Sequence, residues 1–229
     1  MQFKEQTVTR VAAIYTADTL VPVVKALFKE TLPTIDLVNI VDDSLIRDVI
    51  KNGSVSPEVT RRLFYYYEAA ADTGASVIFN TCSSIGDVAE YAKSFSRIPL
   101  IKIDDAMAEE AIQKGTTIGV IATLSTTLKP TVNLIQRKAS QAGKSVHIIE
   151  GLAEGAFDAL TSGKPEIHDE KIRQTASRIA HTVDLFVLAQ GSMAQMQEAL
   201  HSLTGKPVLS SLRSGVESVH TFLKSKGLV

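Results

Sequence analysis

The chain has 229 residues, of which 45% are hydrophobic and 21% charged, and its 24 basic and 25 acidic residues leave a net charge of -1. This composition is typical of a globular protein and argues against disorder, and the length suits one α/β domain or two lobes of roughly 100 residues each. Without an excess of basic residues to neutralise phosphates, nucleic acid is not expected as a partner. A single cysteine, Cys82, excludes an internal disulfide and a Cys-rich zinc site.

The first residues of the chain, which include Lys4 and Glu5, lack the apolar core of a signal peptide. No apolar run approaches the roughly 18 residues that a membrane span requires. We therefore expect a soluble, cytoplasmic protein with no membrane partner.

Short apolar runs alternate with longer amphipathic stretches along the first half of the chain. Four of the runs are expected to be buried strands, at residues 11–15, 37–41, 75–79 and 99–103. Residues 22–29 and 57–72 have the periodicity of helices, and Pro57 stands in a first helical turn, where its missing N–H costs nothing. This alternation predicts an α/β fold with a mostly parallel sheet and helices on both faces.

The second half of the chain repeats the first. Four pairs of identical residues share an offset of 108: Leu20 with Leu128, Pro22 with Pro130, Pro99 with Pro207, and Glu109 with Glu217. Residues 38–42 correspond to 146–150 at the same offset, whereas 52–53 match 162–163 at an offset of 110, so a small insertion lies between. The repeat predicts two pseudo-symmetric lobes, 1–112 and 113–229, with the C-terminal segment able to return to the first. A ligand is expected in the cleft between the lobes, outside the carboxyl ends of the strands.

Each lobe turns polar where its third expected strand ends. The two turns consist of small polar residues: Asn80, Thr81, Cys82, Ser83 and Ser84 in the first lobe, and Gln190, Gly191 and Ser192 in the second. The offset of 108 pairs Cys82 with Gln190. A helix that begins behind such a turn offers free backbone N–H groups and partial positive charge. These suit a carboxylate or phosphate, and they favour the thiolate of Cys82.

These residues also have a purely structural interpretation. A free cysteine is usually a buried small hydrophobe, but the polar neighbours of Cys82 favour a thiol that acts as a nucleophile or proton carrier. The serines could simply cap helices, which is compatible with anion binding. Hydroxyl residues after the first strand of each lobe are expected beside the turns, as carboxylate-binding groups or as caps: Thr16, Thr123, Ser125 and Thr126.

Other groups give weaker indications of chemistry. Asp42 and Asp105 follow expected strands, where a carboxylate could bind metal or act as a base, but such aspartates are more often turn formers or caps. The five histidines have no metal-ligand spacing, and only His168 is a candidate for the cleft, although a solvated helix start is its simpler place. No GxGxxG follows a strand and no P-loop is present, so nucleotide cofactors are not expected.

Taken together, the duplicated lobes, the Cys82 turn and residues 118–123 resemble the aspartate/glutamate/hydantoin racemase superfamily. The resemblance covers residues 11 to about 219 and is most specific at 76–84 and 184–193. It implies two pseudo-symmetric α/β lobes, no cofactor, a small carboxylate ligand and a homodimer. Racemases of this superfamily carry one cysteine per lobe; one takes the α-proton and the other returns it on the opposite face. Cys82 matches the first cysteine, whereas Gln190 stands at the position of the second and cannot carry a proton.

Because Gln190 replaces the second cysteine, the resemblance implies the fold and the ligand class but does not identify the reaction. Two other enzymes of the superfamily differ from this chain in their cysteines. Arylmalonate decarboxylase keeps its key cysteine in the second lobe. Maleate isomerase uses its first-lobe cysteine as a nucleophile but retains a second cysteine. We therefore expect a cofactor-independent isomerase or lyase for a small carboxylic or oxo acid, of isomerase, decarboxylase or tautomerase type, with Cys82 as proton carrier or nucleophile. Two alternatives stay open: a non-catalytic carboxylate-binding protein, and a racemase with a non-thiol second base, Asp42 or His168.

Overall fold

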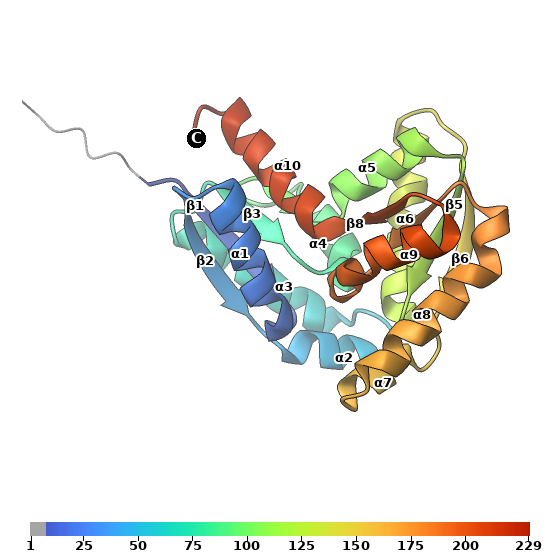
Figure 1. Cartoon of the computed structure of the whole chain (residues 1–229). Helices are drawn as coiled ribbons and strands as arrows, with labels where there is room; N and C mark the ends of the chain where they lie inside the picture. The colour runs from blue at the N-terminus through green and yellow to red at the C-terminus, as the bar shows by residue number, and fades with distance from the viewer. Residues whose placement is uncertain (1–7) are drawn as a thin grey trace, which may run out of the picture.

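A computed structural model describes residues 8–229 as two lobes that meet in a V (Figure 1). Each lobe contains a four-stranded sheet, with the strand orders β2-β1-β3-β4 and β6-β5-β7-β8. All strand pairs in both sheets are parallel. The predicted α/β fold, with two like lobes and a mostly parallel sheet in each, is confirmed.

The strands of the two sheets correspond in order and in length. Their bounds are β1 (Arg10–Tyr15), β2 (Asp36–Val41), β3 (Val77–Asn80), β4 (Leu100–Lys102), β5 (Thr117–Ala122), β6 (His147–Leu152), β7 (Leu185–Leu188) and β8 (Val208–Ser210). The starts of β3 and β7 are 108 residues apart, as are those of β4 and β8. Strands β3 and β7 are buried along their whole length, because helices cover both faces of each sheet.

Helices connect the strands in both lobes. In the described part of the chain they are α1 (Val21–Thr31), α2 (Ser44–Asn52), α3 (Pro57–Asp72), α4 (Gly86–Ala92), α5 (Asp105–Lys114), α6 (Ser125–Gln141), α7 (Ala156–Thr161), α8 (Pro165–Ile179), α9 (Gln197–Thr204) and α10 (Ser211–Ser225). The sequence determines where α3 begins. The Ser56 hydroxyl caps the helix by accepting a hydrogen bond from the N–H of Val59, and Pro57 occupies the first helical position. None of the helices within residues 8–229 is both long and apolar enough to cross a membrane.

The helices that follow the last strand of each sheet cross to the other lobe. Helix α5 follows β4, yet its residues Met107 and Ala111 lie in the core of the second sheet. Helix α10 follows β8, yet Val216 and Val219 lie in the core of the first sheet, and the helix runs beside α1 (Figure 1). Each lobe therefore completes its core with a helix from the other half of the chain. The division at residues 112 and 113 falls within α5 and stays a prediction.

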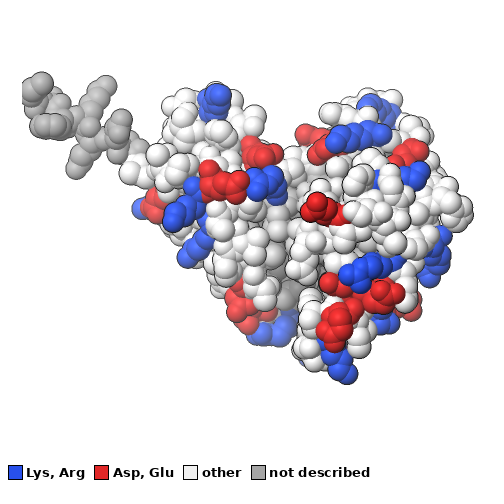
Figure 2. All heavy atoms as spheres, viewed as in Figure 1, with Lys and Arg blue, Asp and Glu red and all other residues white. Residues whose placement is uncertain are grey.

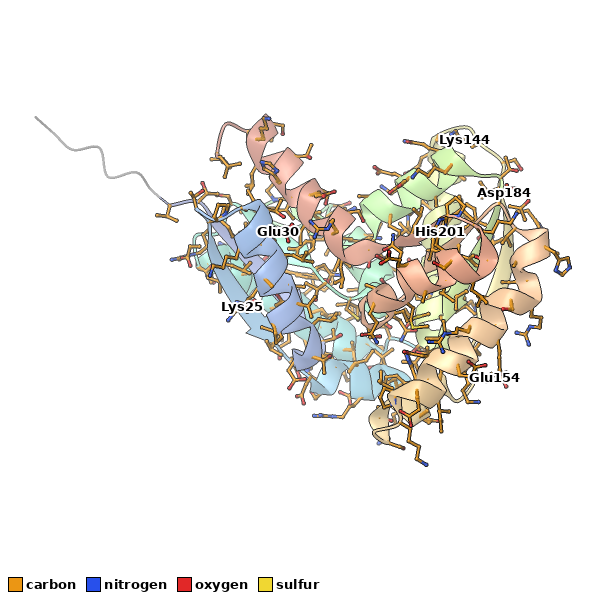
Figure 3. All side chains as sticks on the ribbon, in the orientation of Figure 1. Lys25, Glu30, Lys144, Glu154, Asp184 and His201 are labelled. Atoms are coloured by element: carbon orange, nitrogen blue, oxygen red, sulfur yellow. The ribbon has the colours of Figure 1, made fainter. Side chains whose placement is uncertain are left out.

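A surface ion pair adds to the contact between α10 and the first lobe. Glu30, labelled in Figure 3, extends from α1, and its carboxylate lies 2.9 Å from the guanidinium of Arg213 on α10. Both side chains are more than half exposed, so this pair contributes little compared with the apolar face of α10.

Gly215 allows α10 to lie directly on the chain that follows β4. A Cβ atom at this position would be 2.5 Å from the carbonyl oxygen of Ile103 and 3.0 Å from its Cα. Backbone atoms cannot move aside cheaply, so Gly215→Ala should lower the free energy of unfolding by about 1–3 kcal/mol in urea titrations.

The control for this variant is Glu217→Ala, on the exposed face of the same helix, which should change stability by less than about 0.5 kcal/mol. Alanine is the better helix former by about 1 kcal/mol. A Gly215→Ala protein that is more stable than the parent would therefore show that α10 does not pack closely on the first lobe.

Candidate active site

A pocket of about 360 Å³ lies between the two lobes, at the carboxyl ends of both sheets. Its walls are made by the turns after β1, β3, β5 and β7, by helices α2 and α7, and by the first turns of α6 and α10. The lining residues are Thr16, Ala17, Thr19, Leu20, Ile46, Thr81, Cys82, Ser83, Ser84, Leu124, Thr127, Phe157, Leu160, Thr161, Ala189, Gln190, Gly191, Ser192 and Ser211. Parallel strands bring their carboxyl ends to one edge of a sheet, and here the two edges face each other.

The pocket brings together most of the expected site residues. Eight of them line it: Thr16, Thr81, Cys82, Ser83, Ser84, Gln190, Gly191 and Ser192. Four do not, namely Asn80, Thr123, Ser125 and Thr126. Asn80 and Thr123 are buried and form hydrogen bonds to Cys82 and Gln190 on the side away from the pocket, whereas Ser125 is exposed.

Sequence reasoning missed several residues of the pocket. Thr127 lines it in place of Thr126, because the first turn of α6 directs neighbouring side chains about 100° apart. The hydroxyl run at 125–127 could have pointed to Thr127. Nothing local marks the apolar lining residues Ile46, Phe157 and Leu160, which come from helices far from the polar turns in the sequence.

Cys82 is half-buried at the start of the short 3-10 turn η2 (Ser83–Ile85). Burial raises the pKa of its thiol above the ordinary value. Hydrogen bonding from the Thr16 hydroxyl, from the backbone N–H groups of Ser84 and Ile85 and from the Ser84 hydroxyl opposes only part of this rise. The thiol is therefore the resting form at neutral pH, contrary to the expectation that the turn favours the thiolate.

Hydrogen bonds hold the Cys82 turn from behind. The Tyr67 hydroxyl donates to Asn80 Oδ1 at 3.0 Å, and Asn80 Nδ2 donates to the carbonyl oxygen of Cys82 at 3.1 Å. The hydroxyl of Thr81 donates to the carbonyl oxygen of Ile14 at 2.8 Å. Asn80 and Thr81 thus fix the end of β3 against β1 and set the direction of the thiol.

Gln190 is equally fixed in the second lobe. Its Oε1 accepts hydrogen bonds from the backbone N–H of Thr123 at 2.6 Å and from the Thr123 hydroxyl at 2.9 Å. Because a backbone N–H can only donate, the atom beside it must be the amide oxygen. The Nε2 of Gln190 has no acceptor within residues 8–229 and is available to a ligand.

A buried hydrogen bond joins the two lobes beside the thiol. Ser84 Oγ, from the first-lobe turn, lies 2.9 Å from Thr127 Oγ1, in the first turn of α6. Both side chains line the pocket and both residues are buried. The bond fixes the spacing of the two walls at this point.

An ionic cluster lies behind the first-lobe turn and outside the pocket. Lys102, which is 1% exposed, has its Nζ 3.5 Å from Asp105 and 3.9 Å from Asp104. Asp105 is also 2.8 Å from Lys93 and 3.7 Å from Lys138 of the second lobe. Burial raises the pKa of Asp104; at Asp105 burial is outweighed by Lys102, Lys93 and Lys138, which lower the pKa. The cluster ties the lobes together, and Asp105 is not available as a base in the pocket.

Asp42 and His168 do not line the pocket either. Burial acts to raise the pKa of Asp42, but hydrogen bonds from Ser44, Tyr66 and Arg62 outweigh it and lower the pKa to about 2. A carboxylate so strongly stabilised is a poor base. His168 is fully buried in α8, and is neither solvated nor in the cleft.

Residues 15–219 match the family model described as Asp/Glu/Hydantoin racemase, so the chain belongs to this family. Solved structures of similar fold include a glutamate racemase from Bacillus anthracis, with a TM-score of 0.76, 14% identity and coverage of 96% of this chain and 83% of that one. An allantoin racemase from Pseudomonas fluorescens has a TM-score of 0.66 and 15% identity, with coverages of 96% and 92%. An aspartate racemase from Picrophilus torridus has a TM-score of 0.65 and 12% identity, with coverages of 96% and 94%. No curated protein sequence matches. At these identities the structural likeness shows the fold alone.

Asp42→Asn tests the assignment of Asp42 to structure rather than to chemistry. A pKa of about 2 in the folded protein means that the ionised carboxylate stabilises the fold at neutral pH, and that this contribution is lost as the pH falls from about 4 toward 2. We expect Asp42→Asn to lower the free energy of unfolding at pH 7 by about 1–2 kcal/mol and to have a smaller effect near pH 3. Urea unfolding at both pH values measures the difference.

Asp48→Asn is the matched control, because Asp48 also pairs with Arg62, at 2.9 Å, but is more exposed. It should cost less than about 1 kcal/mol. If Asp42→Asn instead left stability unchanged and removed activity, Asp42 would have to be restored as a second base.

Proposed function

We propose that this protein is a cofactor-independent isomerase or lyase that acts on a small carboxylic or oxo acid and moves a proton with one thiol, that of Cys82. One observation carries the proposal: Cys82 is the only ionisable side chain among the described residues that line the pocket. Membership of the racemase family supports an enzyme. Because two-base racemisation needs two proton carriers, a pocket with one supports single-thiol chemistry.

Neutral donors hold the acid in this proposal. Gln190 offers Nε2, and Thr19 and Ser192 offer hydroxyl groups from the two lobes. Hydrogen bonds to a charged group are stronger than those between neutral groups, so several donors can bind a carboxylate without a basic side chain. The same donors stabilise the negative charge that develops on a substrate oxygen as an enolate forms.

The raised pKa of Cys82 favours the thiol as proton donor. In the decarboxylation of a 3-oxo acid the bond between C2 and the carboxylate breaks, carbon dioxide leaves, and the electron pair is taken up by the 3-oxo group as an enolate. The S–H of Cys82 gives its proton to carbon, and the resulting thiolate takes a proton from water. In an isomerisation the thiolate first takes a proton from the substrate and then returns it to another atom on the same face. Both reactions need one thiol.

Cys82→Ala should lower kcat by about 100- to 10,000-fold while substrate binding changes little, because the thiol acts on the way to the transition state. Hydrogen exchange at carbon in deuterated water and release of carbon dioxide, followed over a panel of small oxo and carboxylic acids, measure both reactions. The control is Ser125→Ala, an exposed hydroxyl that does not line the pocket. Full activity of Cys82→Ala would make Cys82 a lining residue of a binding protein.

The pH dependence of kcat/KM distinguishes a proton donor from a nucleophile. A thiol donor is present below its pKa, so kcat/KM should hold at neutral pH and fall as the pH rises through the raised pKa, above the ordinary value of about 8.5. Because the chain has one cysteine, alkylation by iodoacetamide reports on Cys82 alone and should be slow at pH 7. Fast alkylation at pH 7, together with kcat/KM that rises with pH, would instead identify a thiolate that acts as a base or as a nucleophile.

A further inference from the structure

The polar groups of the pocket gather on the strand-end turns, whereas α2 and α7 contribute mainly apolar side chains, with Thr161 as a hydroxyl at the end of α7. Cys82 and Gln190 stand on the strand-end turns, whereas Ile46 lies on α2 and both Phe157 and Leu160 lie on α7. Figure 1 shows α2 and α7 close together at the lower end of the V, one from each lobe. The apolar side chains are half-buried and line the same pocket as the thiol. A ligand held at Cys82 therefore extends toward an apolar wall.

No charged side chain lines this pocket among the described residues; Asp104 lies behind its wall, where its carboxylate accepts a hydrogen bond from Ser83. In Figure 2 the atoms within the groove between the lobes are mostly white, and the blue and red atoms lie on its rims and on the outer surfaces. The ionisable side chains labelled in Figure 3 are all exposed on those outer surfaces: Lys25, Glu30, Lys144, Glu154, Asp184 and His201. Asp18 and Asp158 are neighbours of lining residues in the sequence, but they are exposed and do not line the pocket themselves.

This distribution sets what the pocket can hold. The ammonium group of an amino acid would find no carboxylate among the described lining residues, and a second carboxylate would lie against Ile46, Phe157 and Leu160 with no basic partner. Burial of an unpaired charge costs several kcal/mol, whereas an apolar substituent in the same place gains about 25 cal/mol for each Å² removed from water.

Resting on the proposed function, we infer that the substrate is a monoanionic acid with an uncharged, apolar substituent, and neither an amino acid nor a dicarboxylate. A branched or aromatic 2-oxo acid, which can enolise, or 3-oxo acid, which can lose carbon dioxide, fits this description. Its carboxylate or oxo group binds the donors around Cys82 and Gln190, and its apolar group contacts the side chains from α2 and α7. The pocket volume of about 360 Å³ is at the small end for ligand sites, which limits the substituent to one ring or one branched chain.

Isothermal titration calorimetry with acids that do not react measures their affinities and tests the inference without turnover. Phenylacetate should bind at least about 10-fold more tightly than acetate, succinate or L-aspartate, because only its substituent is both apolar and able to reach the α2 and α7 wall. Tighter binding of succinate or L-aspartate than of phenylacetate would overturn the inference.

Two variants locate the apolar contact. Phe157→Ala should weaken phenylacetate binding by about 10-fold and leave acetate binding within about twofold, since a lost apolar contact acts only on the substituent. The control, Leu203→Ala, removes a half-exposed apolar side chain of α9 outside the pocket and should leave both affinities unchanged. Equal losses for the two acids in Phe157→Ala would show that the substituent lies elsewhere.

The same titration with Cys82→Ala separates this inference from the proposed function. The variant should bind phenylacetate with the parent's affinity, because the ligand's carboxylate and ring contact groups that remain. If phenylacetate binds to both proteins while no apolar acid is turned over by the parent, the proposed function fails and the ligand class stands. If apolar acids do not bind but a dicarboxylate is turned over through Cys82, the ligand class fails and the proposed function stands.

Discussion

The exchange of α5 and α10 between the lobes is the packing on which the rest of the structure depends. Each helix leaves the last strand of one sheet and completes the core of the other, where α5 packs beside α6 and α10 packs beside α1. The carboxyl ends of the two sheets are therefore held face to face, and the strand-end turns have only one place to meet. Gly215 permits the closest part of this packing, against the backbone at Ile103.

The two pseudo-symmetric turns have similar backbone conformations but different side chains. Cys82 and Gln190 occupy equivalent positions, and both backbones are extended, with φ and ψ of -123° and 121° at Cys82 and -130° and 137° at Gln190. One side chain can carry a proton and the other can only form hydrogen bonds. The site thus keeps the geometry of two like lobes while it concentrates proton transfer in one of them.

Burial affects the ionisable groups behind the Cys82 turn and the thiol of Cys82 itself. Behind the turn, nearby lysines outweigh burial at the half-buried Asp105 and lower its pKa, whereas at Asp104 burial wins and raises the pKa. At the turn itself, Cys82 is buried with donors that compensate only in part, and its pKa rises. The pocket is left with one titratable group in neutral surroundings, which is the basis for both the proposed chemistry and the inferred ligand.

Much of this could be predicted from the sequence. Apolar runs of strand length separated by helical periodicity define a parallel α/β fold, and the recurrence of residues such as Pro99 and Pro207 at one offset defines two like lobes. Residues that directly follow a parallel strand must lie at its carboxyl end, so the sequence alone predicts that Cys82 and Gln190 lie at the cleft.

Tertiary structure alone decided the rest, because it depends on segments that are distant in the sequence. The sign of the pKa change at Cys82 follows from the balance of burial against hydrogen bonds, including that from Thr16 on another strand end. The removal of Asp42 and His168 from the site, the choice of Thr127 over Thr126, and the apolar wall from α2 and α7 follow from how helices pack on the two sheets. Local periodicity determines which face of an element is apolar, but only the packing of distant elements determines what that face meets.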